Sequence, residues 1–174
     1  MPFGYDPAAY QYRPRHPIDE NLLQAARQGY LTRSNTVPGS PERQAVYAAV
    51  YERRVQTGLS YGLPIRAAIG RSRPGEVSMR DIRAAQSRPQ EAPIEVQRHF
   101  AFYNINKYAQ GAVDKFYRGM PRYNPSNLWE RLSQQGDAET LARMMSIQSY
   151  SELHALAQDQ SLREYGGSNP FWYH

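Results

Sequence analysis

The side chains of this sequence that could do chemistry are arginines and tyrosines, concentrated in the first half of the chain. Of the 21 basic residues, 19 are arginine, and both lysines, Lys107 and Lys115, lie in the second half. Residues 1–90 hold 13 basic and 7 acidic residues and residues 91–174 hold 8 and 9, so their net charges are +6 and −1. Arginine pairs bidentately with phosphate and stacks on rings. Arginine with tyrosine, and without lysine, therefore indicates a surface that holds a polyanion closely.

The candidate phosphate contacts are spread over short helices and loops. On a helix predicted from residue 41 to about residue 57, Arg43, Tyr47, Tyr51 and Arg54 follow one another on one stripe. The arginines would neutralise phosphates without reading base sequence, and the tyrosines would pack against the backbone or donate hydrogen bonds to it. The candidate nucleic-acid-binding residues are Arg43, Tyr47, Tyr51, Arg54, Arg66, Arg71, Arg73, Arg80, Arg83 and Arg88.

Plainer explanations of these arginines stay open. GC-rich coding enriches arginine without any function. An arginine-bearing helix face can also be only a solvated surface, and Arg71-Ser-Arg73-Pro can be only a loop.

Enzyme and cofactor motifs are missing from the sequence. The chain has no cysteine, so disulfides and thiolate metal sites are excluded. The four histidines, at positions 16, 99, 154 and 174, lie far apart, and no glycine-rich phosphate loop or nucleophile elbow occurs. No apolar run approaches the ~18 residues that span a bilayer. We expect a soluble or peripheral protein that is not an enzyme and has no cofactor, metal or small-molecule substrate.

Helical periodicity and capping residues predict an all-α fold. Asp19, Ser40-Pro41-Glu42 and the pair Ser149 and Glu152 are helix-start signals. The longest predicted helix carries an apolar stripe of Phe102, Ile105, Ala109, Val113, Phe116 and Met120. The predicted helices cover residues 19–31, 40–57, 65–69, 76–87 and 94–118, followed by three short helices that begin at Ser126, Asp137 and Ser149.

Proline positions and charge divide the chain into four parts. Four prolines in residues 1–17 predict an extended arm. Residues 18–90 form a basic, Arg/Tyr-rich helical region that faces nucleic acid, and the proline-rich segment at 89–93 ends it. Residues 91–167 form a C-terminal helical bundle. Residues 168–174 form a tail with Phe171, Trp172 and Tyr173, which should be covered by a partner.

The segment KYAQGAVDKFYRGMPRYNPSNLWERLSQQGDAETLARMM, from Lys107 to Met145, carries a likeness to a known family. A basic helix with tyrosine and glycine leads to a tryptophan-bearing helix, a glycine stop and another helix. This layout resembles the major coat proteins of filamentous archaeal viruses, rod-shaped or enveloped, with linear double-stranded DNA. The resemblance implies a proline-rich arm, a helix-turn-helix basic region and a C-terminal helical bundle.

The resemblance also implies how such a chain works. Antiparallel coat dimers, of one chain or of two paralogous chains, would wrap double-stranded DNA with their N-terminal helices and keep it in A-form. The chain would belong to the virion, and to the host cytoplasm during assembly; whether an envelope surrounds the filament stays open.

We therefore expect a structural virion protein that coats linear double-stranded DNA in a helical filament. The main alternative is an accessory subunit of a large respiratory or photosynthetic assembly, and a secreted bacterial effector is a third option. A coat should gather its arginines on one concave inner face, whereas an accessory subunit should scatter them over several contacts.

Overall fold

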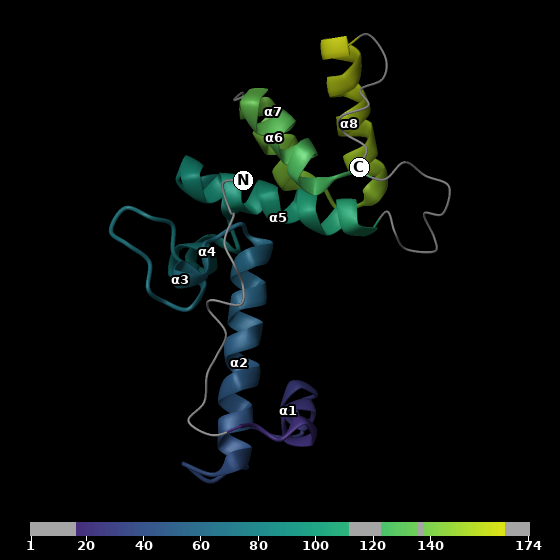
Figure 1. Ribbon diagram of the computed structural model, residues 1–174. Coiled ribbons are helices and arrows are strands. Elements are labelled where there is room, and N and C mark those ends of the chain that lie inside the picture. Colours follow the sequence, from purple (N-terminus) through teal and green to yellow (C-terminus); the bar gives the residue numbers. More distant parts are fainter. Residues whose placement is uncertain (1–16, 112–122, 136–137, 166–174) are drawn as a thin grey trace. The chain divides into compact units, whose positions relative to one another are not determined.

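The computed structural model describes residues 17–111, 123–135 and 138–165 (Figure 1). This part of the chain holds eight α-helices and one short 3₁₀ helix, and no strand occurs in it, which confirms the predicted all-α class. The chain divides into two compact units, one of Met1–Leu59 with Leu63–Glu76 and the other of Ser60–Gly62 with Val77–His174. The division therefore falls near residue 76, whereas the net charge changes near residue 90.

The first unit begins with α1 (Glu20–Arg27), which starts where the sequence predicts. Asp19 Oδ1 accepts hydrogen bonds from the backbone N–H groups of Asn21 at 2.8 Å and Leu22 at 3.2 Å, so Asp19 is the N-cap. The helix ends before the expected residue 31 because the chain turns at Gly29, whose φ of 84° is left-handed.

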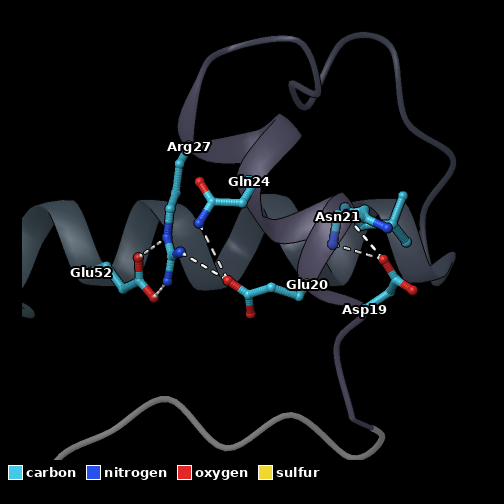
Figure 2. Close-up of polar contacts among 7 residues, drawn as sticks. Asp19, Glu20, Asn21, Gln24, Arg27 and Glu52 are labelled. Atoms are coloured by element: carbon cyan, nitrogen blue, oxygen red, sulfur yellow. Dashed lines mark hydrogen bonds and ion pairs between the residues drawn. The ribbon is translucent and has the colours of Figure 1, made fainter.

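The longest helix of the first unit is α2 (Pro41–Ser60), against which α1 packs. Their shared core consists of Ala26, Ala45, Val46 and Ala49. Arg27 fixes the pairing from outside, because its Nε and Nη2 each donate to a Glu52 carboxylate oxygen at 2.9 Å, while Nη1 lies 3.4 Å from Glu20 Oε1 (Figure 2). Small side chains at the seam let the two backbones approach closely.

A short helix, α3 (Ile65–Ala68), packs against the last turn of α2. Gly58 lies at the contact, and a Cβ added there would lie 2.2 Å from the Cβ of Ala68. The helix continues through Gly58, beyond the expected end near residue 57, and glycine at this position leaves room for α3.

The second unit begins with α4 (Met79–Ala85), and here the predicted start at Glu76 is wrong. Ser78 is the N-cap: its Oγ accepts from the Asp81 N–H at 3.2 Å, and Asp81 Oδ2 accepts from the Ser78 N–H at 2.8 Å. Met79 and Ile82 are buried as expected. The short 3₁₀ helix η2 (Pro89–Glu91) follows.

The centre of the second unit is α5 (Ile94–Gly111), against which α6 (Pro125–Gln135), α7 (Ala138–Ser146) and α8 (Tyr150–Tyr165) pack (Figure 1). Asn104 joins α5 to the end of α7 by donating to the carbonyls of Met144 at 3.0 Å and Met145 at 2.9 Å. Arg143 joins α7 to α8 through an ion pair with Asp159 at 2.8 Å.

The apolar stripe predicted for α5 is right in part. Ile105 and Ala109 are buried, but Phe102 is only half-buried, and its ring meets Trp129 edge-on at 5.5 Å. Ala101 takes the buried position beside Ile105. Val113, Phe116 and Met120 lie outside the described residues.

The starts of α6 and α8 lie within the described residues, and one of them agrees with the sequence prediction. Asn124, not Ser126, caps α6, because Asn124 Oδ1 accepts from the N–H groups of Ser126 at 3.0 Å and Asn127 at 3.1 Å. Ser149 caps α8 as predicted and accepts from the Glu152 N–H at 3.1 Å, although the Glu152 carboxylate accepts from Gln148 instead of Ser149. Asp137 lies outside the described residues.

Candidate nucleic-acid interface

Arg43 is buried in the first unit and is used by the fold. Its Nε donates to Thr36 Oγ1 at 2.7 Å, and its Nη2 donates to the backbone carbonyls of Arg33, at 2.7 Å, and of Thr36. The side chain thus ties the loop before α2 to the first turn of the helix. With 8% of its surface exposed, Arg43 has little of its guanidinium left for a phosphate.

Arg66 is also engaged within the fold. It lies on α3 and forms a two-fold ion pair with Glu76, in which Nε donates to Oε2 at 3.2 Å and Nη2 donates to Oε1. This pair lowers the pKa of the Glu76 carboxyl below its ordinary value. The hydrogen bond that the Arg73 backbone N–H donates to Glu76 is the second cause. Glu76 therefore stays ionised and neutralises Arg66 while it closes the loop between them.

Tyr47 stands beside Arg43 on α2 with 37% of its surface exposed. The Arg43 guanidinium carbon lies 6.0 Å from the centre of the Tyr47 ring. Hydrogen bonding to Arg43, and then the positive charges of Arg43 and Arg33, lower the pKa of the Tyr47 hydroxyl. Tyr51, the next residue of the predicted stripe, is half-buried. Of the two tyrosines of the stripe, Tyr47 is therefore the more exposed, and its hydroxyl lies in a positive field.

Three candidate arginines of the first unit are exposed. Arg54 lies on α2, and Arg71 and Arg73 lie in the loop after α3. None of the three guanidiniums forms a hydrogen bond or ion pair with another described residue. The loop is held instead by backbone contacts, among them Arg71 N–H to the Arg66 carbonyl at 2.6 Å, so its two charged side chains are presented outward.

Three further candidate arginines are exposed in the second unit. Arg80 and Arg83 are exposed on the outer side of α4, whose inner side is Met79 and Ile82. Arg88 has only a loose pair with Glu91 at 3.8 Å, in which both side chains are at least 70% exposed, and such a pair contributes little. Six of the eight candidate arginines therefore keep guanidiniums that water, or a phosphate, can reach.

Besides Arg27, which pairs with Glu52, three exposed arginines of the described residues lie outside the candidate set: Arg33, Arg53 and Arg98. Arg53 precedes Arg54 directly, and this doublet was a usable signal. Arg33 and Arg98 stand singly, so only their exposure distinguishes them, and a sequence does not display exposure.

Clusters of titratable side chains are few among the described residues. Within these ranges no three His, Asp or Glu side chains are grouped to hold a metal ion. The nearest constellation is Tyr123, whose hydroxyl lies 2.6 Å from His154 Nδ1, with the buried Tyr150 ring stacked on His154. It joins α8 to the start of α6 within the core. None of the described helices is long and apolar enough to cross a bilayer.

Comparison of the chain with family models, with curated proteins and with solved structures finds no match.

Proposed function

We propose that the chain is a non-enzymatic structural protein of a virion, which coats linear double-stranded DNA sequence-independently in a helical filament. The observation that supports this most is the exposure of six candidate arginines without a strong internal partner: Arg54, Arg71, Arg73, Arg80, Arg83 and Arg88. Each compact unit contributes three of them. Arg43 and Arg66 are left out of the proposed contacts because the fold uses them.

The binding mechanism is electrostatic. Each exposed guanidinium would pair with a phosphate and release a condensed counterion, and no base contact is needed. Arg71 and Arg73 flank Ser72 in one loop, and Arg80 and Arg83 are neighbours on α4. The Tyr47 hydroxyl, set in the field of Arg43 and Arg33, would donate to a phosphate oxygen.

The arrangement of the chain is proposed along the same lines. An extended arm of residues 1–17 and an aromatic tail of residues 168–174 would join subunits, a helix-turn-helix basic region would face the DNA, and the C-terminal bundle would lie outside it. The partners are double-stranded DNA held in A-form and a second coat chain, identical or paralogous. The chain would lie in the virion, and in the host cytoplasm during assembly.

Electron microscopy of the purified chain mixed with linear duplex DNA tests this proposal. Filaments of uniform width are expected, with lengths that follow the length of the added DNA. Particles that stay small and DNA that stays bare in the micrographs would contradict the coat function.

The alternative, an accessory subunit of a large protein assembly, is favoured by a different observation. Tyr30 and Val37, in the connection between α1 and α2, are 73% and 71% exposed, and a protein that packs on this connection would cover both. Replacing both with serine separates the two functions, because the coat proposal expects unchanged DNA binding from that variant.

A further inference from the structure

The second unit contains an apolar pocket that the proposed DNA contacts do not use. It lies between α5, α6 and α7, and buried Leu132, Leu141 and Met144 with half-buried Trp129 form its walls. Its volume is about 100 Å³. This is smaller than the cavity of about 150 Å³ that binds benzene, so at most one ring-sized apolar group would fit.

The rim of the pocket is cationic and partly apolar. Arg98, one of the exposed arginines, lies there, and its guanidinium has no hydrogen bond or ion pair with another described residue. Ile94 is 48% exposed at the same rim, one turn earlier on α5. An aromatic ring suits this combination best, because it buries apolar area against Trp129 and also places a π-face beneath a guanidinium.

The chain itself carries side chains of that kind. Phe171, Trp172 and Tyr173 are consecutive residues near the end of the given sequence. They belong to the nine-residue segment 166–174, which begins with Gly166-Gly167 and lies outside the described part. We propose that the segment 166–174 of a neighbouring copy inserts an aromatic ring into the pocket of Trp129, Leu132, Leu141 and Met144, under Arg98. The inference rests on the proposed coat function only in taking a neighbouring copy as the source.

The test uses Trp129 as a built-in reporter. The full chain carrying Phe171→Ser, Trp172→Ser and Tyr173→Ser keeps Trp129 as its one tryptophan, because the chain has two in total. A synthetic peptide of residues 166–174 with Trp172→Phe is then titrated while Trp129 emission is recorded. A saturable change in emission is expected; a flat titration overturns the proposal.

Two matched pairs of variants show where the peptide binds. Each variant is made in the chain that carries the three serine substitutions. Ala138→Phe fills the pocket from an exposed lining position and should abolish binding, whereas Ala142→Phe, exposed one turn later on α7, should leave it intact. Arg98→Glu should weaken binding by about fivefold or more, and Lys107→Glu, an equal charge change on α5, should not. If both members of either pair behave alike, or if a peptide of residues 1–17 competes for the pocket, the assignment is overturned.

A photo-crosslinker at position 172 of the full chain identifies the source of the segment. Products of two chains joined at the pocket are expected, and they should disappear with Ala138→Phe; joining only within one chain overturns the proposal. DNA binding of the triple-serine chain is measured separately. If the peptide binds but DNA does not, the coat function fails and the pocket assignment stands.

Discussion

Arg43 and Arg54 both project from α2, but their guanidiniums meet different surroundings. Arg43 donates to two loop carbonyls and to the Thr36 hydroxyl, whereas Arg54 has no hydrogen bond or ion pair with a described residue. Helical spacing predicts both on one stripe of the helix, and both do lie within α2. It could not show that the preceding loop folds back over Arg43, because that depends on contacts between segments seven to ten residues apart.

Arg43→Ala is expected to destabilise the first unit by about 2–4 kcal/mol, because it leaves buried carbonyls without donors. Arg54→Ala should change stability by less than about 0.5 kcal/mol, since Arg54 is exposed. Urea unfolding of both variants measures the difference. Equal stabilities would mean that Arg43 does not hold the loop.

His99 predicts a dependence of stability on pH. Its Nδ1 lies 2.7 Å from the Tyr61 carbonyl, which can only accept, so Nδ1 carries the proton. Burial lowers the pKa of His99 below its ordinary value of 6.5, and the hydrogen bond to Tyr61 offsets only part of this. As pH falls through 6.5, His99 becomes protonated in the unfolded chain while it stays neutral in the folded chain. The free energy of unfolding therefore decreases.

Urea unfolding at about pH 7.5 and about pH 5.5 checks this dependence. The wild-type chain should lose more stability between these two values than His99→Gln, whose amide can still donate to Tyr61 but does not titrate. The same loss in both proteins would place the titration elsewhere.

At the scale of elements, the sequence predicts which helices exist better than where they begin. Asp19 and Ser149 cap their helices as expected, because an oxygen-bearing side chain precedes an apolar repeat without competition. The helix predicted from Glu76 begins at Met79, because Ser78 and Asp81 form a capping box and the Glu76 carboxylate pairs with Arg66 in the preceding loop. Similarly, α6 begins at Pro125 because Asn124 Oδ1 accepts from the N–H groups of Ser126 and Asn127, so Ser126 already lies within the first turn.

Gly58→Ala should destabilise the chain by about 1–3 kcal/mol, because its Cβ would overlap that of Ala68. An unconstrained helix would gain stability from this change, so the sign itself is informative. Adding Ala68→Gly should recover part of the loss in thermal unfolding. A stabilised Gly58→Ala protein would show that α2 and α3 are not in close contact.

The outer face of α4 is the element whose loss should matter most for DNA. Arg80→Glu with Arg83→Glu should abolish duplex binding while circular dichroism and melting stay nearly unchanged, because neither side chain packs in the core. Arg98→Glu with Lys107→Glu makes the same charge change at two exposed positions of α5 and should bind better than the α4 pair. Normal binding by the α4 variant would remove this helix from the interface.

At the scale of the whole molecule, the change in charge and the change in structure fall at different places. The sequence divides near residue 90, where the excess of basic over acidic residues ends, but Arg80, Arg83 and Arg88 belong to the same compact unit as α5. Proline positions and net charge describe the composition of the chain and do not show which side chains are buried together. The boundary of the second unit depends on that burial, here of Met79, Ile82 and their neighbours. The candidate arginines are therefore carried by both units, and residues 1–16 and 166–174 lie outside the described part.

The salt dependence of duplex binding tests the central claim most directly, because phosphate neutralisation by exposed arginines predicts its size. With about six phosphates neutralised, log affinity plotted against log salt concentration should fall with a slope of about −5, alike for duplexes of unrelated sequence. Arg71→Gln with Arg73→Gln should reduce the slope by about 2. A slope near zero, or affinity that depends strongly on base sequence, would contradict the account.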